Sequence, residues 1–176
     1  MNKFIGIFIA IVFLLQFSFF PFVGAEINLL LIFVIILAQK RFDFSGIFWI
    51  FISGILMDIF SAQILGVNLL SFILVAFITS LANSFFVAFE SNRFINSVIY
   101  LAGKLIFDFM KYYLGAIFVV IGISNSNVLM MPKIFSFGYL LSLIIFAIVA
   151  VILLMIYEKL EKFSGEKMQT LIIDKK

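Results

Sequence analysis

Residues 44–60, FSGIFWIFISGILMDIF, and residues 66–89, GVNLLSFILVAFITSLANSFFVAF, are two apolar runs separated by the short connection SAQIL. A helix that spans a membrane needs about 20 mostly apolar residues, because each residue advances about 1.5 Å through about 30 Å of hydrocarbon. Neither run alternates polar and apolar residues as the strands of a membrane barrel do. The two runs therefore predict a pair of adjacent membrane helices joined by a tight turn.

The rest of the chain continues this pattern. Further apolar runs occupy residues 4–23, 27–39, 94–123 and 134–157. Together they predict an all-α integral membrane protein, a bundle of about six transmembrane helices forming one domain over residues 1–157. Residues 158–176 are expected to form a charged cytoplasmic tail. The run 27–39 is short for a full crossing. The run 4–23 has the basic start of a signal peptide, but it exceeds the roughly 7–15 residues of a signal core, so we expect it to be retained.

The composition agrees with a membrane protein and excludes several kinds of chemistry. The chain has 65% hydrophobic and 12% charged residues, with a mean hydropathy of +1.31, whereas soluble domains carry about 25% charged residues. It has no histidine and no cysteine, which excludes disulfides, Cys/His metal sites and histidine-activated nucleophiles. The carboxylates in the loops are scattered singly, without a paired-carboxylate or phosphate-binding motif. We expect a non-enzymatic protein without cofactor or metal, and a net charge of +3 does not indicate nucleic acid.

The basic residues predict how the bundle is oriented. If the N-terminus is cytoplasmic, nine of the twelve Lys and Arg residues fall in cytoplasmic segments and one, Lys133, falls in an external loop. Because cytoplasmic loops of membrane proteins are enriched in Lys and Arg, both termini are expected to be cytoplasmic. The nine are Lys3, Lys40, Arg41, Arg93, Lys159, Lys162, Lys167, Lys175 and Lys176.

Four charged residues, Asp58, Lys104, Asp108 and Lys111, lie within predicted spans. A charge at the membrane centre costs about 2.5–3.5 kcal/mol on insertion scales. The last three follow the spacing i, i+4 and i+7, so they share one helix face and both lysines are expected within reach of Asp108. Asp58 and Asp108 are each 14 residues into their spans, which makes a four-charge cluster geometrically feasible. We interpret these residues as a buried polar clamp, with a pathway or a regulated contact in the outer half of the membrane as the alternative.

The fourth predicted span carries a small residue at every fourth position, at Ala76, Ser80, Ser84 and Ala88. Small residues repeated in this way let two helix backbones approach closely. We expect this helix-packing stripe to face a neighbouring span, with a second copy of the chain or a different protein as the alternatives.

Residues 26–80 contain a block that resembles a known bacterial family. The block holds Ile27-Asn28-Leu29-Leu30-Leu31, the basic turn Lys40-Arg41, Gly54-Ile55-Leu56-Met57-Asp58-Ile59-Phe60-Ser61 and Leu65-Gly66-Val67-Asn68-Leu69-Leu70. It resembles the rod shape-determining protein family MreD, in which a Gly-Leu-Leu-x-Asp-x-x-Ser/Gly segment runs into a Leu-Gly pair and the next helix. The family's usual proline before the second span is replaced by Ile27, and Asn68 stands where histidine is frequent. Beyond residue 90 only the layout of spans agrees.

The resemblance implies a membrane scaffold of the cell-wall elongation complex, the elongasome, in the bacterial cytoplasmic (inner) membrane. Such a protein helps to maintain cell shape during peptidoglycan synthesis. Its principal partner would be MreC, which would link it to MreB filaments and to the elongation glycosyltransferase and transpeptidase. The resemblance also implies a fold similar to the S-components of energy-coupling-factor transporters.

The motif also has a physical interpretation of its own. Gly54 lies one helical turn before Asp58, so another backbone can approach close to the carboxylate. Gly66 permits a tight reversal between the two spans. We interpret Gly54, Asp58, Gly66 and Asn68 as structural or partner-interaction residues. Asp58 either caps the turn or organises the external face on which a partner docks.

Two other functions are alternatives to the scaffold. A substrate-binding, S-component-like subunit of a vitamin transporter would place the polar stripe of residues 94–123 around a small ligand. A pore-forming oligomer would need polar faces along several spans, and only this span shows one. A homodimer is compatible with each of these functions.

Overall fold

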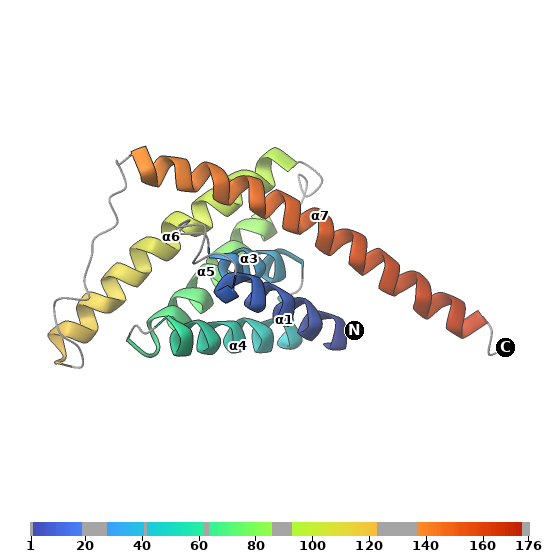
Figure 1. Ribbon diagram of the computed structural model, residues 1–176, viewed down its shortest axis with the longest axis horizontal. Helices are drawn as coiled ribbons and strands as arrows, with labels where there is room; N and C mark the ends of the chain where they lie inside the picture. Colours follow the sequence, from blue (N-terminus) through green and yellow to red (C-terminus); the bar gives the residue numbers. More distant parts are fainter. Residues whose placement is uncertain are drawn as a thin grey trace.

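The computed structural model describes residues 2–18, 28–40, 42–61, 64–85, 93–122 and 137–173. Within these ranges the chain forms six helices and no strand, so the prediction of an all-α fold is confirmed there (Figure 1). The helices are α1 (Asn2–Ser18), α3 (Leu29–Lys40), α4 (Phe44–Phe60), α5 (Val67–Phe85), α6 (Arg93–Val120) and α7 (Phe137–Ile173).

The helix bounds follow the apolar runs closely, except at the C-terminus. α4 occupies the predicted range 44–60, and α3 is shifted from the predicted 27–39 by one or two residues. α7 continues through the charged segment to Ile173, well past the predicted end of the last span at residue 157. Glu158 and Lys162 are four residues apart in this segment, a spacing that supports a solvated helix. Figure 1 shows the end of α7 extending beyond the other helices.

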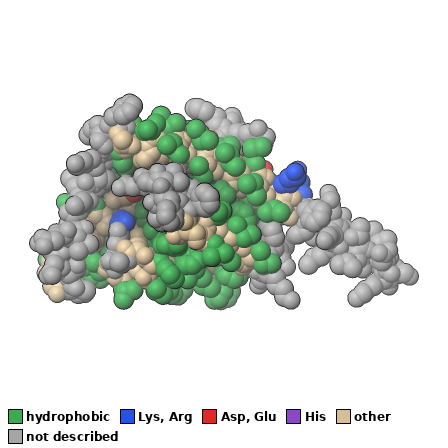
Figure 2. Space-filling model, in the orientation of Figure 1, with side chains coloured by type: hydrophobic (Ala, Val, Ile, Leu, Met, Phe, Trp, Pro, Cys, Tyr) green, Lys and Arg blue, Asp and Glu red, His purple; other side chains and the backbone are tan. Residues whose placement is uncertain are grey.

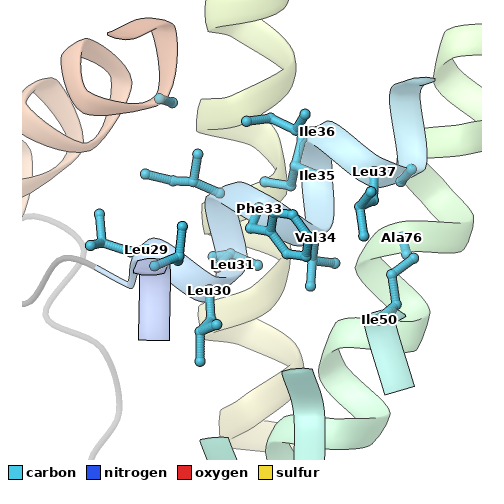
Figure 3. Packing of buried hydrophobic residues seen from close by; sticks show 14 of the residues in the cluster. Leu29, Leu30, Leu31, Phe33, Val34, Ile35, Ile36, Leu37, Ile50 and Ala76 are labelled. Carbon is cyan, nitrogen blue, oxygen red and sulfur yellow. The ribbon is translucent and has the colours of Figure 1, made fainter. Parts of the chain in front are cut away.

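The central element of the bundle is α3, the shortest of the described helices. Its residues from Leu29 to Ala38 are all at most 2% exposed, and α3 packs against α1, α4, α5, α6 and α7. Figure 3 shows leucine, isoleucine, valine and phenylalanine side chains leaving α3 in several directions. A helix that is apolar on all sides has no face suited to water, so it is buried in the middle. At 12 residues, α3 is only about 18 Å long, shorter than a hydrocarbon core.

Contacts between helix ends show that the helices alternate in direction. At one end, here called the Lys40 end, Asn83 Nδ2 donates to Gln39 O and Lys40 pairs with Glu158 at 3.3 Å. At the other end, here called the Asp58 end, the Leu29 N–H donates to Gln16 Oε1 at 2.6 Å. The rings of Phe17 and Phe60 also meet there, 5.1 Å apart. Both α1 and α7 therefore have their chain-terminal ends on the Lys40 side (Figure 1).

The outside of the bundle is apolar. Figure 2 shows hydrophobic side chains over most of the visible described surface. The exposed side chains belong to all of the peripheral helices, whose outer faces carry large apolar residues. They include Ile7, Ile11 and Leu14 on α1, Phe44, Phe48 and Phe51 on α4, Ile73 and Phe77 on α5, Tyr113 and Ile117 on α6, and Ile144, Ile148 and Ile152 on α7.

Two described helical segments, Val67–Phe85 and Gly138–Leu160, are long and apolar enough to cross a membrane by length and composition. The segments Ile5–Ser18, Leu29–Lys40 and Phe44–Phe60 are apolar but shorter. α6 is long enough, at 28 residues, but it carries charged residues in its middle. The prediction of six membrane spans therefore stays a prediction.

Candidate functional site

Asp58 lies in the last turn of α4 and caps the start of α5. Its Oδ2 accepts hydrogen bonds from the N–H groups of Gly66 at 3.0 Å and Leu69 at 3.1 Å, and its Oδ1 accepts from the Asn68 N–H at 3.0 Å. The first N–H groups of a helix have no partner within the helix, and a carboxylate there also interacts favourably with the helix dipole. The side chain is buried, so these bonds replace the water that an ionised carboxylate requires.

Asn68 completes the same hydrogen-bonded unit. Its side-chain Nδ2 donates to Asp58 Oδ1 and to Ser61 Oγ, each at 3.1 Å. The residue is fully buried, and among the described residues its Oδ1 finds no hydrogen-bond partner. The amide therefore connects the last turn of α4 with the first turn of α5. We refer to Gly54, Asp58, Gly66 and Asn68 as the α4–α5 turn unit.

Gly54 lets α4 and α5 approach closely beside this carboxylate. A Cβ added at Gly54 would lie 2.7 Å from Leu69 Cα and 2.8 Å from Leu69 Cδ1. The close approach expected from the sequence therefore occurs within the chain, and the approaching backbone is that of α5. The four residues singled out from the motif lie together at one end of the bundle.

Substituting Gly54 by alanine is expected to push α4 away from α5, because the new methyl group meets backbone that cannot rotate away. Overpacking of this kind costs about 1–3 kcal/mol in a well-packed core. The measurement is the unfolding midpoint of the purified protein in mild detergent. Gly138→Ala is the matched control, because a Cβ at Gly138 meets nothing within 4 Å. Equal midpoints for the two variants would contradict the close packing at Gly54.

Gly66 provides a conformation that other residues rarely adopt. Its φ is +93°, and a Cβ there would meet nothing within 4 Å. Gly66→Ala is therefore expected to destabilise the protein by about 1–2 kcal/mol through backbone strain alone. Gly66→Asn should lose less, because asparagine tolerates positive φ better than alanine. The unfolding midpoints of the two variants check this order, and the reverse order would show that strain is not the cause.

A second group of polar side chains lies between α6 and α7. Lys104 is 5% exposed, and its Nζ lies 3.0 Å from Asp108 Oδ2 one turn further along α6. The hydroxyl of Tyr139 on α7 donates to the same Oδ2 at 2.7 Å. The Lys104 ammonium also lies 5.8 Å from the ring centroid of Tyr139 and 5.6 Å from that of Phe146. Two aromatic rings and one carboxylate thus surround a buried ammonium.

The structure brings three of the four expected charges onto one helix face but keeps Asp58 apart from them. Lys104 and Asp108 form an ion pair, and Lys111 lies 5.9 Å from the ring centroid of Phe107. Asp58 is bonded to the start of α5 instead. α5 packs against both α4 and α6 and so lies between them. The equal depth of Asp58 and Asp108 along their predicted spans does not indicate this separation. The four-charge cluster considered from the sequence is therefore not formed.

The small-residue stripe of α5 is not one continuous packing seam. Ala76 is buried, Ser80 is half-buried and Ser84 is exposed, and Ala88 lies outside the described residues. Residues separated by four positions drift by about 40° around a helix, so the stripe turns away from the buried face. Ser84 Oγ donates to Leu81 O of its own helix. The buried face of α5 consists of Val67, Asn68, Ser71, Phe72, Val75, Ala76 and Thr79.

Sequence reasoning missed the polar contacts that join distant helices. Tyr139 is 31 residues from Asp108, and the Tyr100 hydroxyl donates to Gln39 Oε1 at 3.3 Å across 61 residues. A tyrosine near the start of a predicted span is a weak signal, because tyrosine is common at membrane interfaces. Such pairs depend on which helices become neighbours, and spacing within one run does not encode that.

The chemistry available in the described part of the chain is that of buried hydrogen bonds and ion pairs. Both Asp58 and Asp108 are occupied by donors from the protein itself. The described residues contain no group of three or more His, Cys, Asp or Glu side chains placed to hold a metal ion. The two polar groups therefore hold helices together, at the α4–α5 turn and between α6 and α7.

Comparison of the chain with protein-family models, with curated proteins and with solved structures finds no match.

Proposed function

We propose that this chain is a multi-pass protein of the bacterial cytoplasmic membrane and a non-enzymatic scaffold of the cell-wall elongation complex, with MreC as its principal partner. The observation that carries the proposal is the α4–α5 turn unit. Three of the motif residues on which the resemblance to the MreD family rests, Asp58, Gly66 and Asn68, form one hydrogen-bonded unit at the Asp58 end, and Gly54 packs beside it. In this proposal the role of the motif is structural: it shapes the face that the protein presents to a partner.

Placement in a membrane is supported by the surface of the bundle. Large apolar side chains are exposed on every peripheral helix, which water would disfavour and lipid would accept. Lys3, Lys40 and Arg93 stand at helix ends that belong to the Lys40 end, and Lys159 and Lys162 follow Glu158, which pairs with Lys40 there. In this proposal the Lys40 end is therefore cytoplasmic, and the α4–α5 turn unit is external.

A scaffold role is supported by what the polar side chains do. The carboxylates of Asp58 and Asp108 accept hydrogen bonds from the bundle's own residues, which leaves them poorly suited to proton transfer with a substrate. The apolar outer faces of α4 and α7 are available to lipid or to a partner helix. A single-span protein such as MreC would add one helix to such a surface.

The test is affinity purification of the tagged chain from its own host's membranes in mild detergent, with mass spectrometry of the proteins recovered. We expect MreC together with the elongation glycosyltransferase and transpeptidase. Asp58→Asn should reduce recovery of MreC by about tenfold or more, which corresponds to about 1.4 kcal/mol, because the turn that shapes the external face is weakened. Asp43→Asn is the matched control, since Asp43 is an exposed carboxylate that caps the other end of α4.

Two results would contradict the proposal. One is recovery of an ATPase pair with a coupling membrane subunit, which would indicate a transporter subunit. The other is unchanged recovery of MreC with Asp58→Asn while the variant is inserted normally, which would separate the turn unit from partner binding. Insertion is checked by labelling a single cysteine at Leu65, an exposed residue at the Asp58 end, in a chain that has no other cysteine.

A further inference from the structure

α7 is held against the bundle along one face, with polar contacts near the two ends of that face. Its buried side chains are Phe146, Ala150, Leu154 and Tyr157, spaced three or four residues apart as in a helix seam. One polar contact is the bond from the Tyr139 hydroxyl to Asp108 of α6, here called the Tyr139 clamp. The other is the Lys40–Glu158 ion pair with α3, here called the Glu158 clamp.

The distance between the clamps matches the thickness of a membrane. Tyr139 and Glu158 are 19 residues apart in one continuous helix, which corresponds to about 28 Å. If α7 crosses the bilayer, the Tyr139 clamp lies near its external side and the Glu158 clamp near its cytoplasmic side. One rigid helix thus connects a polar contact on each side of the membrane.

The seam between the clamps is mostly apolar, and two of its rings make directed contacts: Phe146 with the Lys104 ammonium and Tyr157 with Phe8. Contacts of Phe146, Ala150 and Leu154 depend on packing and do not impose hydrogen-bond geometry. Packed helices shift by about 1–2 Å when an interface changes, and interfaces of this kind adopt discrete arrangements. The polar contacts near the two ends of this seam therefore add a directional preference to the packing.

The two helices to which α7 is clamped also contact each other. A Cβ added at Gly103 of α6 would lie 2.6 Å from Ile35 Cδ1 of α3, and Tyr100 of α6 bonds to Gln39 of α3. α6 and α3 therefore approach each other closely.

We infer that α7 is a coupling element that links the two faces of the protein. Opening the Tyr139 clamp shifts α7 and weakens the Glu158 clamp, and opening the Glu158 clamp weakens the Tyr139 clamp, because linkage between two sites is reciprocal. The part of α7 beyond Glu158 carries this shift past the end of the bundle (Figure 1). The inference rests on the membrane placement in the proposed function but not on the identity of any partner.

The two clamps differ in strength, which sets the design of the experiment. Lys104 and Asp108 have side chains only 7% and 16% exposed, whereas Lys40 and Glu158 are 30% and 45% exposed. An exposed ion pair is screened by solvent, so Glu158→Gln alone is too mild a change. Lys40→Glu instead places two negative charges together, so their repulsion opens the Glu158 clamp. The double variant Lys40→Glu/Glu158→Lys restores the ion pair with the charges exchanged.

The test uses pairs of spin labels on the full chain reconstituted in lipid nanodiscs. Labels at Phe44→Cys and Lys162→Cys report the Lys40 end, and labels at Ile59→Cys and Leu140→Cys report the Asp58 end. All four positions are exposed, and the chain has no cysteine of its own. Tyr139→Phe keeps the ring and removes the hydroxyl, and Asp108→Asn is a second variant that weakens the same clamp. Tyr113→Phe, an exposed tyrosine of α6, is the matched control.

We expect Tyr139→Phe to shift the distance at the Lys40 end by roughly 2–5 Å, between a small interface shift and one helical turn. Lys40→Glu should shift the distance at the Asp58 end, and Glu158→Lys should return it to the original value. Shifts confined to the mutated end would overturn the inference, as would equal shifts in Tyr113→Phe. Loss of MreC from the purified complex would test the proposed scaffold separately, without bearing on these distances.

Discussion

Asp58→Ala is expected to lower the free energy of unfolding by about 3–5 kcal/mol, since several buried donors lose their acceptor at once. Three backbone N–H groups at the start of α5 and the side chain of Asn68 all bond to this carboxylate. Alanine leaves these donors buried and unpaired, and it removes a negative charge from the start of a helix. The measurement is equilibrium or thermal unfolding in mild detergent, followed by circular dichroism.

Two variants show whether the loss has this cause. Asp58→Asn keeps one acceptor oxygen but turns an amide toward the α5 backbone, so its stability should fall between those of the wild type and Asp58→Ala. Asp43→Ala removes an N-cap that accepts a bond from Gly46 alone, and it should cost only about 1 kcal/mol. If Asp43→Ala and Asp58→Ala were equally destabilising, Asp58 would be acting as an ordinary helix cap.

Lys104→Met is expected to destabilise the protein by about 3–5 kcal/mol, because it leaves the Asp108 carboxylate in the bundle without its ammonium partner. Methionine fills a similar volume, so the lost charge and not a cavity causes the effect. The Tyr139 hydroxyl remains as a donor but supplies no full positive charge. Unfolding in a graded mixture of mild and denaturing detergent measures the loss.

A double variant separates the ion pair from simple packing. Lys104→Met combined with Asp108→Leu removes both charges, and replacing a buried ion pair by apolar residues is often close to neutral. We therefore expect the double variant to be more stable than Lys104→Met alone, with a coupling energy of about 1–3 kcal/mol in the double-mutant cycle. If the two losses simply add, the lysine and the carboxylate do not depend on each other.

At the candidate site, the sequence predicts that the residues of the α4–α5 turn unit lie close together. Gly54, Asp58, Gly66 and Asn68 lie within 15 residues, so short-range geometry limits where they can be, and the structure brings them together. The sequence left two roles open for Asp58. The hydrogen bonds to α5 show that the carboxylate caps this helix. Whether the same turn also meets a partner depends on a surface outside the chain.

For the charged residues, the sequence predicts the contact within one helix but not the contacts between helices. The pairing of Lys104 with Asp108 follows from their i, i+4 spacing, and it is present. The proposed approach of Asp58 to that pair depended on α4 and α6 being neighbours, and α5 lies between them. Tyr139, which bonds to Asp108 from α7, carried no signal in its own sequence neighbourhood.

The sequence alone predicts the helices, because each apolar run is long enough to form one and ends at polar or glycine-containing turns. It also determined the pairing of charges within one helix turn. Tertiary packing places the short α3 at the centre and α5 between α4 and α6, and it brings Tyr139 and Glu158 of α7 to their partners on α6 and α3. The physical reason is that an apolar surface packs against any other apolar surface. The choice of neighbours therefore comes from shape, helix length and a few polar contacts between residues far apart in the chain.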